Sequence, residues 1–356
     1  MKLANFFVKE IEKTDCEKTL NNYINKDDLL NIDKMKDYCS RNIIFSEKYE
    51  LLDYIDSGSE SIVYSCLIKN KKNKLISKII FNKKKEKINQ KELEISTRLK
   101  HKNIINVYAY SHIIKNESWC MIMEYAKYGN LSNFRRNIIK RLNLSESMIC
   151  FIANQILEGL NFCYYSKIAH MDLKAKNIVV DEFLNMKIID FSISIDYREK
   201  KPCETIKLPF LGTCFYMPLE IIVSQKIKYR DLHKIDLYSF GVILYNLAFG
   251  KYPYNLTYDD EENYEKISQK LFINNIGLEN ENNEYSKYFF DFLNKLLEKD
   301  ITKRINIFEA RNHYWIKGSK ILLDEKEKIN NINLFINYLL IDHIKKFNNY
   351  VGKNNR

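Results

Sequence analysis

The sequence predicts an α+β protein made of two packed lobes, the first rich in strands and the second rich in helices. Its 356 residues are too many for one small module and suit a single large domain or two lobes. Hydrophobic residues make up 46% of the chain and aromatic residues 13%, which supplies a sizeable core and excludes global disorder. After Glu124 the pattern changes from short runs of Ile, Val and Tyr to longer helical periodicities.

The first lobe is expected to hold five strands and one helix. Runs of β-branched and aromatic residues, bounded by short polar turns, indicate strands. These are expected at Glu50–Ile55, Ile62–Ile68, Leu75–Phe81, Ile105–His112 and Trp119–Glu124. Between the third and fourth strands, apolar residues at helical spacing predict a helix over Lys87–Leu99.

The second lobe is expected to be helical. Apolar residues recur at helical spacing in Ser145–Tyr165, and Asp236–Phe249 is apolar enough to be a buried helix. Tyr285–Leu297 has the pattern of an amphipathic helix. The acidic, polar stretch 256–284 is expected to be a solvated insertion.

The ends of the chain are expected to lie outside these lobes. Residues 1–47 are interpreted as an N-terminal extension, and residues 48–318 as the two-lobed domain. Its first lobe is expected at about 48–124 and its second at about 127–318. Residues 319–356 have the charge and apolar stripe of a helical C-terminal tail.

The chain is basic, with a formal net charge of +11. A positive net charge can indicate that a protein binds nucleic acid, a membrane surface or an acidic substrate. A general richness in Lys, Asn and Ile explains it without such partners, so no specific nucleic-acid binding is expected. The stretches Lys69–Lys74 and Lys83–Lys87 are interpreted as solvated turns, with a phosphate- or acid-binding surface as the alternative.

The spacing of the cysteines and the length of the apolar runs indicate in which cellular compartment the protein is expected. No two of the eight cysteines have the two-residue spacing of a zinc or redox motif. The chain opens without the pattern of a secretory signal, and its longest apolar run, Phe240–Phe249, is about half a bilayer span. A reduced protein without a membrane span is therefore expected in the cytoplasm, with the nucleus as the alternative.

The stretch from Ile168 to Val180 carries the most informative chemistry. It reads Ile-Ala-His-Met-Asp-Leu-Lys-Ala-Lys-Asn-Ile-Val-Val, and Asp190 begins a later run, Asp-Phe-Ser. Asp172, Asn177 and Asp190 place oxygen-bearing side chains between apolar strand fragments. A hard cation such as Mg²⁺ takes ligands of this kind, with substrate phosphates completing its shell.

These two segments resemble the catalytic loop and the metal-binding loop of the protein kinase family. An ordered set of further matches runs from Tyr49 to Trp315, about three quarters of the chain. The resemblance implies the bilobal protein kinase fold, with a small β-rich N-lobe that includes one helix and a larger helical C-lobe. It also implies transfer of the γ-phosphate of ATP to protein hydroxyls.

The resemblance assigns the reacting groups. Asp172 would orient the substrate hydroxyl and accept its proton, and Lys174 would steady the γ-phosphate. Asn177 and Asp190 would bind the metal ions, which are expected to be Mg²⁺ with Mn²⁺ as the alternative. Lys174 lies two residues after Asp172, as in serine/threonine kinases, which favours serine and threonine hydroxyls over tyrosine.

The nucleotide-binding residues follow from the same resemblance. Lys78 would hold the α- and β-phosphates and pair with Glu92, with Glu94 as the alternative on another helix face. Met123 would be the gatekeeper before a hinge whose backbone bonds adenine. The expected ATP-binding residues are Ile55, Gly58, Val63, Ile76, Lys78, Met123, Glu124, Ala126 and Val179.

Structural roles are implied for five more residues. These are Phe191, Thr213, Glu220, Asp236 and Arg304. Thr213 and Glu220 would belong to the activation segment, and Arg304 would be the buried partner of Glu220, since a guanidinium can hold a carboxylate with two hydrogen bonds. Asp236 would anchor the catalytic-loop backbone.

Several positions depart from the family pattern. Gly58 is the one glycine kept of three in the phosphate loop. Met171 replaces an arginine, and Ser192 replaces a glycine, which is expected to remove easy access to positive φ. Ile76 replaces a small alanine, and Ser96 takes an apolar helix position.

Two functions therefore stay open. The first is an active, divergent serine/threonine protein kinase that acts on protein substrates, with a regulatory partner engaged through the terminal extensions. The second is a pseudokinase that binds partners with weak or no phosphotransfer. A small-molecule phosphotransferase lacks support, because it would not need the peptide-docking segment from Thr213 to Glu220 or Arg304.

Overall fold

The computed structural model describes residues 49–57, 61–71, 73–80, 86–113, 118–139, 144–208, 211–256, 264–273 and 285–322. The expected extension 1–47, most of the expected tail 319–356 and Gly58 lie outside these residues. The chain divides into two compact units. One comprises residues up to 129 with 165–172 and 177–198, and the other comprises 130–164, 173–176 and residues from 199 onward.

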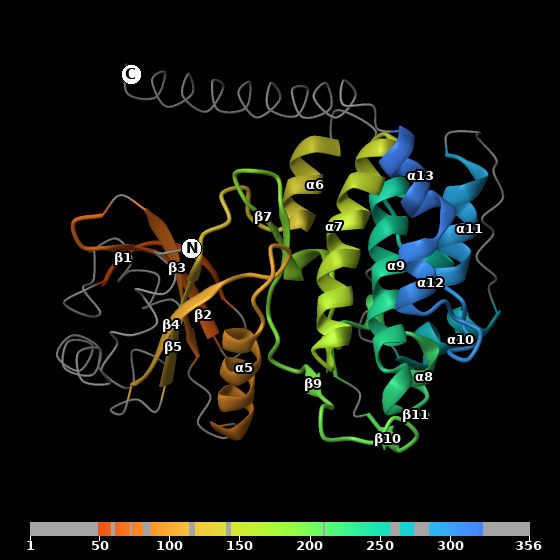
Figure 1. Ribbon diagram of the computed structural model, residues 1–356, viewed down its shortest axis with the longest axis horizontal. Helices are drawn as coiled ribbons and strands as arrows, with labels where there is room; N and C mark the ends of the chain where they lie inside the picture. Colours follow the sequence, from red (N-terminus) through yellow and green to blue (C-terminus); the bar gives the residue numbers. More distant parts are fainter. Residues whose placement is uncertain are drawn as a thin grey trace. The chain divides into compact units, whose positions relative to one another are not determined.

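The first unit is built on a five-stranded antiparallel sheet (Figure 1). Its strands are β1 (Tyr49–Ser57), β2 (Ser61–Ile68), β3 (Lys74–Ile80), β4 (Val107–Ile113) and β5 (Ser118–Glu124), in the order β1-β2-β3-β5-β4. Helix α5 (Glu86–Arg98) follows β3. Two short strand pairs complete the unit, β6 (Ile168–Ala169) with β9 (Ile195–Asp196) and β7 (Ile178–Val180) with β8 (Met186–Ile188).

The two faces of this sheet differ because side chains alternate along each strand. One face carries a buried apolar cluster that includes Ile62, Ile79 and Ile122. On the other face Leu93 of α5 packs with Ile80, and this face also carries Lys78. The sheet therefore holds Lys78 on the side that α5 covers.

The second unit is mostly helical. Its helices are α6 (Leu131–Ile139), α7 (Glu146–Tyr165), α8 (Leu219–Ile222), α9 (His233–Phe249), α10 (Tyr264–Ile273), α11 (Lys287–Leu296), α12 (Ile307–Asn312) and α13 (Tyr314–Leu322). One small sheet pairs β10 (Thr205–Lys207) with β11 (Lys226–Lys228). Short 3₁₀ helices lie at Ala175–Asn177, Cys214–Tyr216, Tyr229–Asp231 and Pro253–Asn255. The α+β class and the strand-rich and helix-rich division are confirmed.

Helix α9 is the buried centre of the helical unit (Figure 1). Nearly all of its residues are buried, as its apolar composition predicts. Gly241 allows α11 to approach closely, because a Cβ there would lie 2.9 Å from the Cβ of Leu296. The helix ends at Gly250, whose φ of 74° is the left-handed conformation that glycine adopts readily.

One expectation about this unit was wrong. The stretch 256–284 was expected to be a solvated insertion, yet it contains α10. Ile267 and Leu271 are only 1% and 2% exposed. Residues four apart share one face of a helix, so Ile267 and Leu271 lie together on a buried face of α10.

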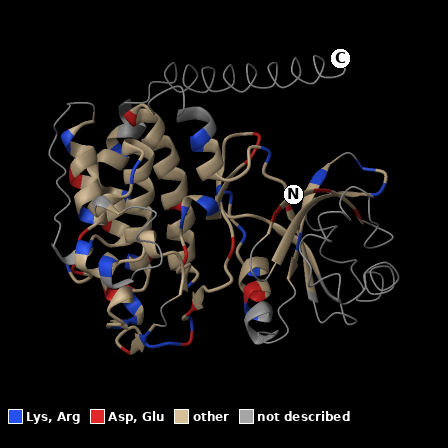
Figure 2. Cartoon of the chain, turned by 180° about the vertical axis from the view of Figure 1, so that it is seen from behind, with Lys and Arg blue, Asp and Glu red and all other residues tan. Residues whose placement is uncertain are grey.

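Lys and Arg are spread over many elements and loops, with Asp and Glu among them (Figure 2). None of the helices described is long and apolar enough to cross a bilayer.

Candidate functional site

Lys78 is the centre of a buried ion cluster in the strand-rich unit. It lies on β3, where its register partners are Val63 on β2 and Met121 on β5. Its Nζ lies 2.7 Å from Oε1 of Glu92 and 2.9 Å from Oδ1 of Asp190. One ammonium group thus joins a carboxylate from α5 to a carboxylate that lies beyond β8 in the chain.

Helix periodicity decides between the two glutamates of α5. Glu92 is 4% exposed and faces the sheet beside Leu93, whereas Glu94 is exposed. Residues two apart on a helix point about 200° apart, so they cannot share one face. The structure therefore brings Glu92 to Lys78 and leaves Glu94 in solvent.

The cluster fixes the charge of its members. Burial alone would raise the pKa of the Asp190 carboxyl, but the Lys78 charge and hydrogen bond, helped by His170 and Ser192, lower this pKa to about 2. Burial would also favour a neutral amine at Lys78, yet Glu92 and Asp190 hold its pKa above the ordinary value. Near neutral pH the cluster is one cation between two carboxylates.

Asp172 and Asn177 are joined directly. The Nδ2 of Asn177 donates to the backbone oxygen of Asp172 at 2.8 Å and lies 3.2 Å from its Oδ2. The Ile189 N–H donates to the Asn177 carbonyl at 2.9 Å, which ties Asn177 to the residue before Asp190. Three of the candidate side chains are thus linked within the strand-rich unit.

His170 orients this loop and was missed in the sequence analysis. Its side chain is fully buried, and its Nδ1 accepts the Asp172 N–H at 3.3 Å. Its Nε2 lies 2.9 Å from the carbonyl oxygen of Ile189, so the proton sits on Nε2 in this arrangement. The His-x-Asp spacing was a signal that could have identified it.

Two residues of the site have a left-handed backbone conformation. They are Met171, with φ 71°, and Asp190, with φ 68°. Ser192 is not among the described residues with positive φ, which agrees with the expectation that it lacks the easy access of a glycine to that conformation.

Three of the side chains expected to bind ATP share the sheet face of Lys78. Ile76 on β3 is the register partner of Met123 on β5, and Val63 is the partner of Lys78 itself. All three are half-buried, as Val179 is on β7. Ile55 is 45% exposed and lies at the register shift of β1 between Tyr54 and Asp56.

A polar network holds the end of β5. The Glu124 N–H donates to the Asn106 carbonyl at 2.9 Å. Its carboxylate accepts from the Asn106 side chain at 3.0 Å and lies 3.1 Å from Nζ of Lys187, which is 5% exposed. The Gly129 N–H donates to the Ala126 carbonyl at 3.2 Å. Hydrogen bonds and an ion pair within the strand-rich unit therefore fix the end of β5, and a further hydrogen bond fixes the segment from Ala126 to Gly129.

The helical unit contains the remaining candidates. Nζ of Lys174 donates to Oγ1 of Thr213 at 2.8 Å. Arg304 is fully buried and holds Glu220 with two hydrogen bonds, Nη1 to Oε1 at 2.6 Å and Nη2 to Oε2 at 3.0 Å. Asp236 is 3% exposed.

Phe191 belongs to the strand-rich unit. It is 1% exposed and packs on the ring of His170.

Comparison with known proteins identifies the family. The family model described as the protein kinase domain matches residues 49–316. The chain belongs to the protein kinase family. A protein kinase domain implies the use of ATP with a divalent metal ion, and proteins as substrates.

Three relatives show the range of similarity to this kinase. A protein of Acanthamoeba polyphaga mimivirus, named as a serine/threonine-protein kinase, is 30% identical over 253 residues, which are 64% of this chain and 53% of the relative. Serine/threonine-protein kinase par-4 of Caenorhabditis briggsae is 27% identical over 230 residues, or 64% and 33%. An SNF1-related protein kinase catalytic subunit alpha of Arabidopsis thaliana is 31% identical over 229 residues, or 64% and 42%. This kinase therefore spans about half or less of the length of each.

The kinase offers few protein ligands for a metal. Among the described residues, no group of three or more His, Cys, Asp or Glu side chains is placed to hold an ion. The Asp190 carboxylate and the Asn177 amide oxygen fit a cation that takes one or two protein ligands and completes its shell with phosphate and water. Mg²⁺ prefers this kind of site, so the donor set fits a metal–nucleotide complex.

Proposed function

We propose that this protein is an active serine/threonine protein kinase that transfers the γ-phosphate of ATP to protein hydroxyls. The observation that carries the proposal is the position of Lys78 between Glu92 and Asp190. In protein kinases the strand lysine must pair with the helix glutamate, and the metal-binding aspartate must also be in place, before phosphoryl transfer occurs. The pairing of Lys78 with Glu92, and the position of Asp190 beside Lys78 in the same unit, support the proposal.

Asp172 is the group that we assign to the substrate hydroxyl. The His170 ring accepts its N–H and Asn177 donates to its carbonyl oxygen, so the backbone of Asp172 is fixed before any substrate binds. In the transfer, the hydroxyl oxygen forms a bond to the γ-phosphorus and its proton passes to the Asp172 carboxylate. The bond between the γ-phosphorus and the β–γ bridging oxygen breaks, and ADP leaves. Positioning and charge stabilisation supply most of the rate enhancement.

Lys78 and Lys174 are assigned to the phosphates. Lys78 binds the α- and β-phosphates, and Glu92 keeps its ammonium group charged and in place. Lys174 is held by Thr213, which leaves its charge to steady the γ-phosphate. Asn177 and Asp190 would hold Mg²⁺, which would supply positive charge to the phosphate oxygens.

The adenine ring is assigned to the segment after β5. Val63, Ile76 and Met123 lie on one face of the sheet, and we assign Val179 on β7, Ile55 near the end of β1 and Gly58 to the same nucleotide site. The Glu124 N–H and the Ala126 carbonyl already have partners. The Glu124 carbonyl and the Ala126 N–H are therefore the backbone groups assigned to the base.

Two features support serine and threonine as acceptors. Lys174 follows Asp172 by two residues and is bonded to the Thr213 hydroxyl. The relatives from mimivirus and Caenorhabditis briggsae also bear names of serine/threonine-protein kinases. We propose proteins with serine or threonine hydroxyls as the substrate class and no individual substrate protein.

The proposal is tested by incorporation of labelled γ-phosphate into a generic basic protein. The wild-type protein is expected to transfer label to serine and threonine, as shown by phosphoamino-acid analysis. The rate of Asp172→Asn is expected to be at least about tenfold lower, which corresponds to an activation barrier about 1.4 kcal/mol higher. Equal rates in the two proteins would reject the assignment of Asp172. Nucleotide binding without any transfer by the wild type would instead support a pseudokinase.

A further inference from the structure

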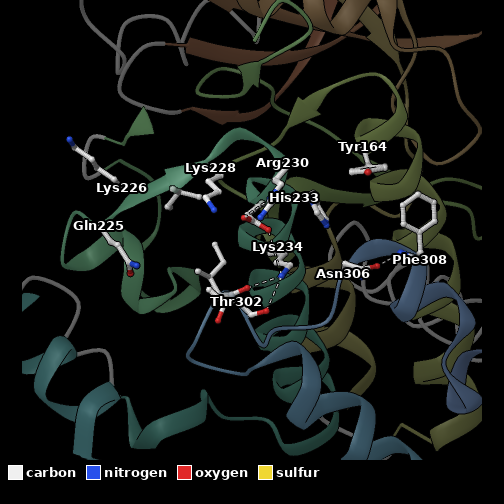
Figure 3. Close-up of a pocket in the computed structure, with 13 residues that line it drawn as sticks. Tyr164, Gln225, Lys226, Lys228, Arg230, His233, Lys234, Thr302, Asn306 and Phe308 are labelled. Carbon is white, nitrogen blue, oxygen red and sulfur yellow. Dashed lines mark hydrogen bonds and ion pairs between the residues drawn. The ribbon is translucent and has the colours of Figure 1, made fainter. Parts of the chain in front are cut away.

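A separate cavity of about 550 Å³ lies within the helical unit and contains none of the residues assigned to nucleotide or metal (Figure 3). Its wall is formed by β11 and the turn that follows, the first residues of α9, the end of α7 and the segment from Ile301 to Phe308. Its volume is in the range of small-ligand and side-chain pockets.

The cavity is strongly cationic. Lys226, Lys228, Arg230 and Lys234 line it, against a single lining carboxylate, Asp231. Asp231 lies 3.7 Å from Arg230 and 3.6 Å from Lys234. Among the described residues no carboxylate lies within ion-pair distance of Lys226 or Lys228, and both are exposed. The pocket therefore carries a net positive charge that the described part of the chain does not neutralise.

One of these cations is built into the protein. Lys234 is 8% exposed, and its Nζ donates to the Ile301 carbonyl at 2.8 Å. Its own carbonyl accepts from Arg304 at 3.1 Å, and the same guanidinium holds Glu220. The floor of the pocket is therefore rigid, so a ligand meets a preformed positive surface.

The sheet beside the pocket places like charges opposite each other. Lys207 on β10 is the register partner of Lys226, and Thr205 is the partner of Lys228. Like charges directly opposite on two strands are destabilising, and an anion between them relieves the repulsion. Lys226 and Lys228 are two residues apart on β11, which corresponds to about 7 Å along the strand. Alternate residues of an extended peptide have the same repeat.

The other end of the pocket is aromatic. Figure 3 shows Tyr164 and Phe308 together on the side opposite Lys226 and Lys228. The Tyr164 ring makes edge-to-face contacts with His233, at 4.8 Å between centroids, and with Phe308, at 5.4 Å. These contacts engage the Tyr164 ring within the protein, so it is a wall for an apolar side chain more than a platform for a nucleic-acid base.

We propose that this pocket binds an extended peptide segment of a partner protein that carries phosphates on alternate residues, followed by an apolar residue. The phosphates pair with Lys228 and Lys226, and the apolar side chain packs on Phe308. Charge-assisted hydrogen bonds to phosphate are about twice as strong as neutral ones, which makes phosphorylation of the partner the switch for binding. The proposal concerns binding alone and stands whether or not the chain transfers phosphate.

The test uses the full chain without ATP and a fluorescein-labelled peptide in which two phosphoserines are separated by one alanine and followed by leucine. Fluorescence anisotropy is expected to show salt-dependent binding of this peptide and none of its unphosphorylated form. Lys228→Glu is expected to weaken binding at least about tenfold, Lys228→Arg to retain it, and the exposed Lys251→Glu to leave it unchanged. Thermal melting confirms that each variant is folded.

Other outcomes would overturn the proposal. The proposal is wrong if the phosphopeptide does not bind, or if Lys251→Glu weakens binding as much as Lys228→Glu does. It is also wrong if inorganic pyrophosphate binds as tightly as the peptide and displaces it. A single-stranded RNA that bound more tightly than the peptide and lost affinity in Lys228→Glu would replace the peptide as the ligand. Asp190→Asn is expected to bind the peptide as wild type does, which separates failure of this site from failure of phosphotransfer.

Discussion

Arg98, in the last turn of α5, donates a hydrogen bond of 2.9 Å from Nη1 to Oδ2 of Asp196 on β9. The same helix carries Glu92, and Asp196 lies six residues after Asp190. The pair therefore ties together the two segments whose carboxylates meet at Lys78. Many kinases obtain such a tie from a phosphate on the activation segment. Here a carboxylate supplies the charge permanently.

The first prediction concerns this tie. Partial burial opposes ionisation of Asp196, but its hydrogen bonds with Arg198 and Arg98 lower its pKa below the usual value. A lowered carboxylate pKa gives a contribution that is complete above the unfolded pKa and is lost as pH falls through the folded one, so the tie is intact at neutral pH. Asp196→Asn is expected to reduce kcat/KM by about tenfold, close to 1.4 kcal/mol, because α5 is less firmly held.

Matched variants separate the tie from a general loss of charge. Arg98→Met is expected to match Asp196→Asn, and Arg98→Lys to recover part of the loss. Arg198→Gln should have a smaller effect, since the Arg198 contact with Asp196 lies within one segment, whereas the Arg98 contact joins α5 to β9. Wild-type kinetics in both Asp196→Asn and Arg98→Met would show that the contact is incidental.

The second prediction concerns the two glutamates of α5. Glu92→Gln removes the charge that holds Lys78 and is expected to lower the phosphotransfer rate at least about tenfold. Glu94→Gln removes the same charge from the exposed face and should retain wild-type activity. Steady-state kinetics of both variants, with circular dichroism to check folding, is the measurement. A larger loss in Glu94→Gln would mean that the helix face has been assigned incorrectly.

The third prediction concerns stability. Arg304 and Glu220 form a buried bidentate pair, with side-chain exposures of 0% and 1%. Glu220→Gln leaves the Arg304 charge buried and is expected to cost about 3–5 kcal/mol of unfolding free energy. The partly exposed pair of Arg311 and Glu158 is the control, and Glu158→Gln should cost about 1 kcal/mol or less. Urea denaturation followed by circular dichroism measures both, and similar costs would contradict the distinction between buried and surface pairs.

Local sequence pattern was enough to predict most of the fold. Alternating β-branched and aromatic residues located all five strands of the main sheet, helical spacing located α5, α7 and α11, and the apolar composition of Asp236–Phe249 located α9. The amphipathic elements have strong periodicity because one face of each is buried, whereas nearly all residues of α9 are buried. The first strand begins at Tyr49, one residue before the predicted start. Helix α10 was missed because the acidic and polar composition of 256–284 obscured the helical spacing of Ile267 and Leu271, which are buried.

Contacts between distant residues were predicted only where a family motif pointed to them. The resemblance named Lys78 with Glu92, and the structure brings them together. No such pattern marks Arg98 with Asp196, or Lys187 with Glu124, because each joins elements far apart in the chain. Pairs of this kind depend on the folded geometry, and a chain with many lysines offers too many candidates.

The last prediction concerns control by phosphorylation. In many kinases a phosphate on the activation segment pairs with the arginine before the catalytic aspartate and orders the loop. That position is Met171, which has no charge and lies in the left-handed conformation at φ 71°. Thr205 is exposed on β10, where its register partner is Lys228, so a phosphate there would meet a local cation.

Activity is therefore expected to be unchanged by phosphatase treatment and by Thr205→Ala. Thr213 is excluded from the test because its hydroxyl accepts from Lys174. A fall of about tenfold in either measurement, or 1.4 kcal/mol, would show that an activation-segment phosphate controls the enzyme despite Met171.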